Sequence, residues 1–457
     1  MLVSVNPAVF RESDIRGLVN IDLTLETVEL IGKAIGTYMR RKGARFLCLG
    51  RDVRKSSDEF REALSCGITS SGCHQIDIGL VPTPVFYFAL HHLELQGGVM
   101  ITGSHNPSEY NGFKICLGVH TIHGSAVQEL RALIEAEDFE TGQGRIWEAN
   151  VRENYIQAVI ERTTLSRPLR VVVDGGNACF GLVGPELLKR LGLDIIELYC
   201  EPDGNFPNHH PDPTELENLI DLRHHVKKEG ADLGIGFDGD VDRIGVVDES
   251  GNRVMGDELL MLFSRDILNR HPKATVIGEV KCSQLLFDDI EDHGGVPVMT
   301  AVGHSLIKKK MFETGALLAG EMSGHICFAD NYYGFDDAMF AACRLLQIVS
   351  ESNQSLGEMV GQLPKAVSTP EIRIFCEDEK KFGIVQEIKK DFGNKFPMVD
   401  IDGIRLDFGD GWALVRASNT QPALTLRFEA SNSCRLKEFQ QIVQDSLLKI
   451  DLNLNFH

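Results

Sequence analysis

Short apolar runs that end in turns or helices recur along the whole chain. Three of them lie at residues 45–50 (RFLCLG), 170–174 (RVVVD) and 274–280 (ATVIGEV). Each precedes a small-polar turn and a helical pattern, namely RDVRKSSDEFREALSCGI, GGNACFGLVGPELLKRLG and KCSQLLFDDIEDHG. A strand, a turn and a helix form the repeating unit of a βα fold. The pattern therefore predicts an α/β protein.

A second apolar strand follows in each unit, about 40–60 residues after the first, and ends in a polar loop. GGVMI leads into TGSHNP, ADLGIGF into DGDVDR, and ALLAG into EMSGHICF. Open α/β sheets bind ligands at the carboxyl ends of their strands. The spacing indicates three related α/β units that each present one such loop. On spacing alone, chance resemblance among α/β segments is the alternative.

Turn signals and composition divide the chain into four domains. Breaks are expected near 150, in TGQGRIWEANVRENYIQAV, near 252, after DESGN, and near 365, in the Pro- and Ser-containing SLGEMVGQLPKAVSTPEIRIF. The remainder mixes the strands EIRIF, DGIRLDF, GWALVRAS and ALTLRFEA with two helices, which predicts an α+β domain. The expected domains are residues 1–150, 151–252, 253–365 and 366–457.

Charge and cysteine content narrow the functional classes. The 457 residues have a formal net charge of -20, which argues against nucleic-acid binding but leaves room for a small anionic substrate in a locally basic cleft. The eleven cysteines lack paired spacing, and Cys282 and Cys327 lie in apolar runs typical of buried thiols. The amino-terminal segment is not typical of a signal peptide, and no apolar run reaches the ~20 residues of a membrane helix. We expect a cytoplasmic protein that neither binds nor crosses a membrane.

The sharpest motif is DGDVDR, at residues 238–243. Asp238, Asp240 and Asp242 alternate directly after a strand-like segment, so their side chains can project to one side. Three hard oxygen ligands suit Mg²⁺, and a bare cluster of carboxylates would repel itself. The motif predicts a magnesium site, with an acidic surface loop as the alternative.

Two other interpretations of this loop are a calcium-binding EF-hand and a phosphotransferase with an aspartate nucleophile. Arg243 stands where an EF-hand needs glycine, and IGVVD continues as a strand where a helix should begin, so the EF-hand fails. An aspartyl-phosphate on Asp238 stays open from this loop alone.

Two further polar loops follow strand-like segments. RASNT (416–420) offers a guanidinium, two hydroxyls, an amide and successive backbone N–H groups that can hold a phosphate, although a simple turn would use the same residues. EMSGH (321–325) offers a carboxylate and a hydroxyl for vicinal sugar hydroxyls. A buried turn with a satisfied histidine is the alternative there.

Ser104 lies in ITGSHNPSEYNGFKI (101–115), between Gly103 and His105. The sequence shows no obvious histidine and carboxylate that could form the charge relay of a hydrolase with Ser104. His105 is adjacent in sequence and is expected to point elsewhere. A serine that carries a phosphoryl group needs a cation and a proton carrier instead. Lys114 could be that carrier if neighbouring cations depress its pKa, and a solvated surface lysine is the alternative.

Taken together, the motifs ITGSHNPSEYNGFKI, GFDGDVDRIGVVDESG, GEMSGHICF and VRASNTQPALTLRFEA resemble the α-D-phosphohexomutase family, in its order and over the whole chain. Met322, within GEMSGH, favours the bacterial phosphomannomutase/phosphoglucomutase branch over the glucosamine branch. The resemblance implies three related α/β domains with mixed sheets and a C-terminal α+β domain like the TATA-box-binding protein, around a central cleft.

The resemblance also implies roles for individual residues. The catalytic residues would be the phosphoserine Ser104, with Lys114, Arg243 and His304. Mg²⁺ would be held by Ser104, Asp238, Asp240 and Asp242. The substrate would be bound by Arg16, Lys281, Glu321, Ser323, His325, Arg416, Ser418, Asn419 and Thr420.

The implied activity is reversible phosphoryl transfer between the 1- and 6-positions of mannose or glucose phosphates, in carbohydrate metabolism. It would proceed through a phosphoserine enzyme and a hexose 1,6-bisphosphate, which also acts as activator. The alternatives are an aspartyl-phosphate enzyme that uses Asp238, a phosphoglucosamine mutase, and an inactive sugar-phosphate-binding protein. The preferred sugar, the choice between Lys114 and His304 as acid/base, and the choice between monomer and dimer stay open.

Overall fold

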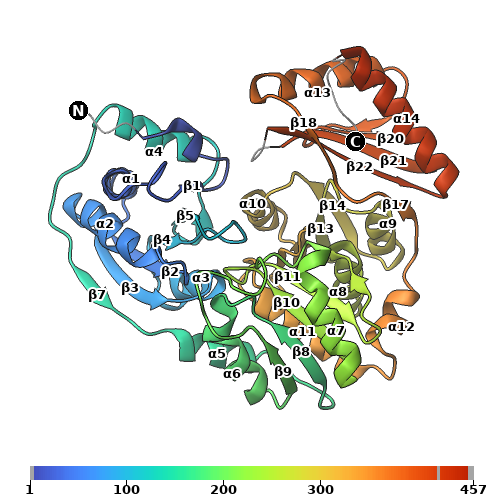
Figure 1. Cartoon of the computed structure of the whole chain (residues 1–457), viewed down its shortest axis with the longest axis horizontal. Coiled ribbons are helices and arrows are strands. Elements are labelled where there is room, and N and C mark those ends of the chain that lie inside the picture. Colours follow the sequence, from blue (N-terminus) through green and yellow to red (C-terminus); the bar gives the residue numbers. More distant parts are fainter. Residues whose placement is uncertain (1–4, 419–421, 451–457) are drawn as a thin grey trace.

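The computed structural model describes residues 5–418 and 422–450, which form four units, each built around its own β-sheet (Figure 1). The first unit lies on the left of Figure 1, the second and third fill the lower and central right, and the fourth lies above the third. We number the units by their order along the chain.

The first unit is a mixed sheet with helices packed against it. Its strands are β1 (Ile15–Leu18), β2 (Phe46–Arg51), β3 (His74–Leu80), β4 (Gly97–Ile101), β5 (Tyr110–Leu117), β6 (His120–Thr121) and β7 (Ile146–Glu148). Its helices are the 3-10 turn η1 (Pro7–Val9), α1 (Leu25–Arg41), α2 (Ser57–Ser70), α3 (Thr83–His92) and α4 (Ser125–Glu135). The strand order is β1-β5-β4-β2-β3-β7, with β6 beside β5. β4 runs parallel to β2 and antiparallel to β5, so its loop reverses the chain direction.

The second unit repeats this arrangement on a smaller scale. Its strands are β8 (Arg170–Asp174), β9 (Asp194–Leu198), β10 (Leu233–Phe237), β11 (Ile244–Asp248) and β12 (Arg253–Val254). Its helices are α5 (Arg152–Ile160), η2 (Cys179–Leu182), α6 (Gly184–Arg190), η3 (Leu216–Leu219) and α7 (Ile220–Glu229). β8 and β10 are almost wholly buried, as expected for parallel strands covered on both faces.

The third unit has a sheet of four strands. Its strands are β13 (Thr275–Glu279), β14 (Val296–Thr300), β15 (Leu318–Gly320) and β16 (Ile326–Phe328). Its helices are α8 (Gly256–Arg270), α9 (Gln284–Asp292), α10 (His304–Thr314) and α11 (Ala338–Glu351), and α12 (Leu356–Gly361) leads towards the fourth unit.

The first three sheets share one topology. Their central orders are β5-β4-β2-β3, β11-β10-β8-β9 and β16-β15-β13-β14, with the first pair antiparallel and the others parallel in every case. The prediction of three related α/β units is therefore confirmed. The loops at residues 102–109, 238–243 and 321–325 occupy the same place in each sheet, between its parallel and its antiparallel strand.

The fourth unit is an antiparallel sheet covered by two helices, so the α+β prediction is confirmed. Its strands are β17 (Val367–Ser368), β18 (Ile372–Phe375), β19 (Met398–Val399), β20 (Ile404–Asp407), β21 (Gly411–Ala417) and β22 (Ala423–Ala430). The helices α13 (Asp378–Phe392) and α14 (Ser433–Ile450) contribute to a core that is separate from those of the other units.

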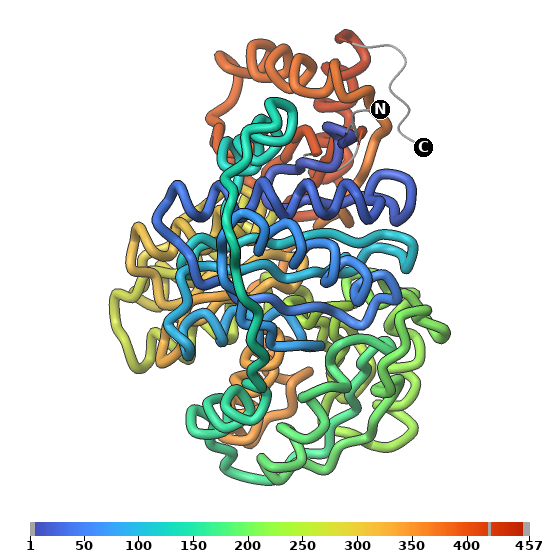
Figure 2. The backbone as a smooth tube through the Cα atoms, turned by 90° about the vertical axis from the view of Figure 1, so that its left-hand side faces the viewer, coloured from blue at the N-terminus to red at the C-terminus, as the bar shows by residue number. Residues whose placement is uncertain are grey.

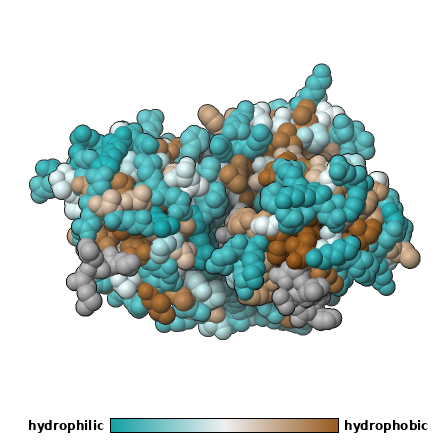
Figure 3. Space-filling model, turned by 90° about the horizontal axis from the view of Figure 1, so that it is seen from above, coloured by the Kyte–Doolittle hydropathy of each residue, from teal (hydrophilic) through white to brown (hydrophobic). Residues whose placement is uncertain are grey.

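One large apolar core joins the first three units. It includes Phe86 from α3, Tyr155 from α5 and Phe340 from α11, all of which are almost fully buried. The chain between α4 and α5 passes along the outside of the first unit, where β7 pairs with β3 (Figure 2). The first three units thus form one packed body. Seen from above, the surface is hollowed between its left part and the right part that contains the fourth unit (Figure 3).

The fourth unit contacts the third through a small set of polar and apolar contacts. Arg405 donates hydrogen bonds to the carbonyls of Val280 and Cys282, and Trp412 packs against Val280. The ammonium of Lys281 lies 3.1 Å from Glu371 Oε2, at the start of the fourth unit. No helix among the described residues has the length and apolar character needed to span a bilayer.

The contact between Glu371 and Lys281 predicts an acid-sensitive attachment of the fourth unit. Burial by itself would raise the pKa of Glu371, but the charges of Lys281 and Arg373 outweigh it and lower the pKa to about 2. Since this lies below the ordinary value of 4.5, the stabilisation is complete above pH 4.5 and is lost as the pH falls from 4.5 towards 2.

We expect Glu371→Gln to lower the thermal midpoint at pH 7 by about 2–4 °C, the effect of ~1 kcal/mol for a partly exposed pair. The difference from the wild type should shrink as the pH falls below 4.5. Glu377→Gln is the control, because Glu377 forms an exposed pair with Lys380 in the same region. A difference that stays constant with pH would contradict the assignment.

Candidate functional site

The three strand-end loops meet at one buried point. Ser104, from the β4–β5 loop, donates a hydrogen bond of 3.0 Å to Asp238 Oδ2 in the β10–β11 loop. His325 Nδ1, from the β15–β16 loop, lies 3.6 Å from Asp242 Oδ1. A Cβ atom at Gly239 would lie 2.2 Å from the Ser104 carbonyl oxygen, so glycine is needed where the first two loops touch. The side chains predicted from separate motifs therefore form one site.

The shape of the Ser104 loop depends on Arg54, in the segment before α2. Ser104 has a left-handed backbone with φ of 49°, and its N–H donates to Thr102 Oγ1. The buried Arg54 guanidinium fills the space beside Gly103, where a Cβ would lie 2.5 Å from it. Its N–H groups donate to Asp52 Oδ2 and to the carbonyl oxygens of Ser104, Asn106, Pro107 and Tyr110.

The carboxylates of the β10–β11 loop are held from both the backbone and the neighbouring unit. Asp238 Oδ1 accepts hydrogen bonds from the backbone N–H groups of Asp242 and Arg243. Asp240 Oδ2 accepts a hydrogen bond of 2.5 Å from Thr83, at the start of α3. All three aspartates are fully buried, and burial together with the charges of Asp242 and Asp240 raises the pKa of Asp238 well above its ordinary value.

This group of carboxylates fits a divalent cation. One oxygen each from Asp238, Asp240 and Asp242 lies within 4.8 Å of the others. Asp240 Oδ1 and Asp242 Oδ1 are buried and have no hydrogen-bond partner within the part of the chain that the structure describes. Unpaired buried carboxylate oxygens are costly, and hard oxygen ligands suit Mg²⁺. The acidic cluster therefore offers the kind of ligands that a divalent cation prefers.

Lys114 extends from β5 to the opposite side of the same carboxylates. Its ammonium lies 2.6 Å from Asp240 Oδ2 and also contacts Asp242 Oδ2. Burial would lower the pKa of Lys114, but Asp240 and Asp242 outweigh it and raise the pKa above its ordinary value. The pKa depression that a proton carrier at Lys114 would require is therefore absent, because the nearest charges are anionic.

His105 contacts Ser104, contrary to the expectation that it points elsewhere. Its Nδ1 lies 3.2 Å from Ser104 Oγ. The pKa of His105 is held well below its ordinary value by burial and then by the charges of Arg243 and Arg16. A hydrolase triad needs a carboxylate behind the histidine, whereas the groups that dominate the surroundings of His105 are cationic. The serine-hydrolase interpretation therefore fails because the neighbours of His105 are cationic, and not because His105 points away from Ser104.

The β15–β16 loop contributes a carboxylate, Glu321, and a hydroxyl, Ser323, to the site. Glu321 Oε1 accepts a hydrogen bond of 2.6 Å from the N–H of Gly303, and Glu321 Oε2 accepts one of 3.1 Å from Ser323. Burial would raise the pKa of Glu321, but His325 and Lys281 outweigh it and lower the pKa. An ionised carboxylate with a hydroxyl beside it can read two neighbouring hydroxyls of a ligand.

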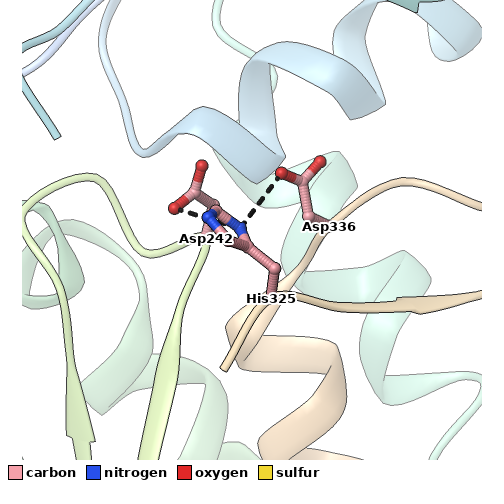
Figure 4. Close-up of side chains that lie close together, drawn as sticks. All are labelled: Asp242, His325 and Asp336. Atoms are coloured by element: carbon pink, nitrogen blue, oxygen red, sulfur yellow. Dashed lines mark ion pairs between the residues drawn. The ribbon is translucent and has the colours of Figure 1, made fainter. Parts of the chain in front are cut away.

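A further carboxylate, Asp336, lies beside the histidines of the site. His325 Nδ1 lies between Asp242 and Asp336, at 3.3 Å from Asp336 Oδ2 (Figure 4). His304, the first residue of α10, lies with its Nδ1 3.2 Å from the same oxygen. Arg243 Nε donates a hydrogen bond of 3.0 Å to His325 Nε2.

Three other predicted residues, Arg16, Arg416 and Ser418, lie on the first and fourth units, outside the acidic cluster. Arg16, on β1, donates to Asn106 Oδ1 in the Ser104 loop. Arg416, on β21, pairs with Asp402, which also accepts a hydrogen bond from the N–H of Val302 just before α10. The Ser418 carbonyl accepts a hydrogen bond from Lys381. Asn419 and Thr420 lie outside the described residues.

Two residues that contact the groups of the site, Arg54 and Asp336, were not identified from the sequence. Arg54 lies in RDVRKSS, which reads as the polar start of a helix, and Asp336 lies in GFDDAMF, which reads as a helix cap. Asp337 is that cap, since its side chain accepts a hydrogen bond from the N–H of Phe340. A doubled Asp before a helix, of which one residue suffices as cap, is the signal that could have identified Asp336.

Four family models match the chain in order. Three are described as phosphoglucomutase/phosphomannomutase alpha/beta/alpha domains I, II and III, over residues 7–141, 153–251 and 255–367. The fourth is the phosphoglucomutase/phosphomannomutase C-terminal domain, over residues 371–446.

Individual relatives match over nearly their whole length. A phosphomannomutase/phosphoglucomutase of Pseudomonas putida is 46% identical over 98% of this chain and 97% of its own. A phosphoglucomutase of Neisseria gonorrhoeae is 44% identical, with 96% of each chain covered. The crystal structure of a phosphoglucomutase/phosphomannomutase family protein from Burkholderia thailandensis superposes with a TM-score of 0.94, at 38% identity over 99% of both chains.

The contacts of Arg54 predict that lysine cannot replace it. An ammonium has three donors, so at least two of the five oxygens that accept from Arg54 would lose their partner in Arg54→Lys. We expect kcat/KM to fall about 100-fold, the effect of displacing a reacting group by ~1 Å, together with a lower thermal midpoint. Arg61→Lys is the control, because Arg61 pairs with Asp77 on β3, outside the Ser104 loop. Equal activity of both variants would contradict a role for Arg54 in shaping the loop.

Proposed function

The chain belongs to the phosphoglucomutase/phosphomannomutase family, and we propose that it interconverts the 1- and 6-phosphates of a hexose through a phosphorylated Ser104. It is an isomerase, an intramolecular phosphotransferase that acts on hexose phosphates. The observation that supports this role of Ser104 is its position. Its buried hydroxyl donates a hydrogen bond to Asp238, one of the three aspartates of the acidic cluster.

The transfer exchanges one P–O bond for another. A hexose hydroxyl, O6 or O1, attacks the phosphorus of phosphoserine 104, and the bond from phosphorus to Ser104 Oγ breaks. The resulting hexose 1,6-bisphosphate turns end over end, and its other phosphoryl group returns to Ser104. Both half-reactions use the same site, so the bisphosphate is both intermediate and activator.

Asp238, Asp240 and Asp242, with the phosphoryl group on Ser104, would hold Mg²⁺. The fit rests on the buried Asp240 Oδ1 and Asp242 Oδ1, which lack a hydrogen-bond partner within the described chain. A bound Mg²⁺ would offset negative charge on the transferring phosphoryl group. Arg243 is anchored beside Asp238 and supplies a further fixed positive charge.

His304 fits the proton carrier for the attacking hydroxyl better than Lys114 does. Burial and the charge of Lys308 lower the pKa of His304, so its imidazole is neutral near pH 7 and can accept a proton. Lys114 is held protonated between two carboxylates and serves as a fixed charge that orients them. Lys114 therefore stabilises charge, and His304 transfers the proton.

The remaining loops bind the parts of the sugar that do not react. Glu321 and Ser323 would read two hydroxyls, with His325 beside them. The distal phosphate would be held by Arg416, Ser418, Asn419 and Thr420. Arg16 and Lys281 would also bind the substrate. A hydroxyl-reading pair and a separate phosphate site accept the sugar in either orientation, as the turnover of the bisphosphate requires.

Asp238 is a poor alternative nucleophile in this geometry. One of its oxygens accepts two backbone N–H groups and the other accepts the Ser104 hydroxyl. Both oxygens are thus engaged as acceptors, which favours Ser104 as the phosphoryl carrier. The sugar is glucose or mannose phosphate. A preference for glucosamine phosphate is the alternative, and the kcat/KM values of the three 1-phosphates would separate them.

Ser104→Ala is expected to lower isomerisation by at least ~10³-fold with hexose 1,6-bisphosphate present, because no group remains to carry the phosphoryl. Ser108→Ala, an exposed serine of the same loop, should keep wild-type activity. Intact-protein mass should show one phosphate on the wild type that resists hydroxylamine. Near-normal turnover of the variant, or a hydroxylamine-sensitive phosphate, would favour Asp238 instead.

Removal of divalent cations is expected to stop isomerisation without unfolding the chain. After dialysis against EDTA, activity should fall to background and return with added Mg²⁺, while circular dichroism stays the same. Without the cation, the buried carboxylates would repel the negatively charged phosphoryl group that is being transferred. Full activity in EDTA would contradict the cation site.

A further inference from the structure

We propose that Asp336 is a positioning residue that orients His304 and His325, and through His325 also Arg243, for phosphoryl transfer. The inference rests on the proposed function and adds to it a residue that lies behind the reacting groups. Its basis is the set of contacts that meet at one carboxylate oxygen, Asp336 Oδ2 (Figure 4).

The backbone places Asp336 at the junction of the loops. Two isolated β-bridges join Arg243 to His325 and Cys327 to Asp336. The start of β11, the start of β16 and the segment before α11 therefore lie side by side. The side chain of Asp336 is fully buried, so its oxygens face protein groups and not solvent.

The proton of His325 can be located from its partners. Arg243 is always protonated and donates to His325 Nε2, so Nε2 accepts and carries no proton. The imidazole proton is then on Nδ1, which faces Asp336 Oδ2 at 3.3 Å and Asp242 Oδ1 at 3.6 Å. An anion at Asp336 favours this tautomer, and the tautomer keeps Nε2 available to hold the Arg243 guanidinium.

The same oxygen orients His304. Its Nδ1 lies 3.2 Å from Asp336 Oδ2, and its ring lies parallel to that of His325, with centroids 5.5 Å apart and planes 17° apart. The anionic Asp336 beside Nδ1 favours the tautomer with the proton on Nδ1, which leaves Nε2 to accept a proton from the sugar hydroxyl. A carboxylate behind a histidine performs this orienting function in other proton-transfer sites.

The charge of Asp336 is balanced without solvent. Lys308, one turn along α10 from His304, lies with its ammonium 2.8 Å from Asp336 Oδ1 and 4.0 Å from the centre of the Tyr87 ring. Burial would raise the pKa of Asp336, but Lys308 and His304 outweigh it and hold the pKa well below its ordinary value. One oxygen of Asp336 thus pairs with a lysine, and the other faces the two histidines.

The neighbouring carboxylates have different environments. Asp337 accepts hydrogen bonds from Tyr155 and Tyr332 and caps α11, and burial raises its pKa to about 6. Asp330, on the same connection between β16 and α11, pairs with Arg270 and Arg344. Both serve the packing of the third unit, whereas Asp336 faces the reacting centre.

The experiment compares Asp336→Asn with Asp330→Asn in the full chain with Mg²⁺ and hexose 1,6-bisphosphate. Asp336→Asn keeps the shape but presents an amide to the histidines, so kcat should fall by about 10- to 100-fold while KM changes little. Asp330 is also buried, and Asp330→Asn should lower the thermal midpoint but leave kcat near the wild-type value. Equal kcat in the two variants, or a loss confined to KM, would overturn the proposal.

Nitrogen NMR of histidine-labelled protein provides a readout that a purely structural role would not change. His304 and His325 are identified by loss of their signals in His304→Gln and His325→Gln. We expect His325 to be protonated on Nδ1 in the wild type and to shift towards a mixed tautomer in Asp336→Asn. Unchanged imidazole signals in that variant would contradict the proposal.

A double variant covers the case in which Asp336→Asn does not fold because Lys308 is left without a counter-charge. Asp336→Asn with Lys308→Met removes both charges, which costs less than removing one. It should fold and still show the kcat loss. If the wild type itself does not isomerise hexose phosphates, the proposed function fails. If the wild type is active and the double variant equals it, only the role of Asp336 fails.

Discussion

The arrangement of the site depends on balancing the charge of buried carboxylates with cations from other segments. Asp240 and Asp242 lie on the β10–β11 loop of the second unit, whereas Lys114 comes from β5 of the first. Asp336, in the third unit, is balanced by Lys308 and faces the histidines. Because a buried unpaired charge is strongly unfavourable, the units gain stability only when the loops meet in this geometry. The same requirement leaves room for a divalent cation on the unpaired carboxylate oxygens.

The shared topology explains how three loops reach one point. In each of the first three sheets, the chain leaves the last parallel strand and returns antiparallel beside it, so the loop lies at the carboxyl edge. One apolar core holds these sheets as a single body, while the fourth unit has its own core and contacts the third through Arg405, Trp412 and Lys281. The three strand-end loops therefore lie on one packed body, whereas β21 belongs to the fourth unit, which has a separate core.

The strand-end motifs were predictable because their chemistry is local. Three alternating aspartates after an apolar strand indicated a cation site, and the strand IGVVD, now β11, excluded an EF-hand. The glycines beside Ser104 and Asp238 permit close approach, which a pattern of residue types can suggest. By contrast, the pKa of Lys114 depends on which charges lie near it in space, and the sequence left open whether neighbouring cations lower that pKa.

The sequence by itself determined the α/β class, the three related units, the antiparallel fourth unit and the residue types of the site, because periodicity and motif chemistry are short-range properties. Only the tertiary structure decided which groups touch. Arg54 and Ser104 are 50 residues apart, and Asp336 is 94 residues from Asp242, yet each pair takes part in one cluster of contacts. Such partners are chosen by burial and charge balance across units, and these are properties of the assembled fold.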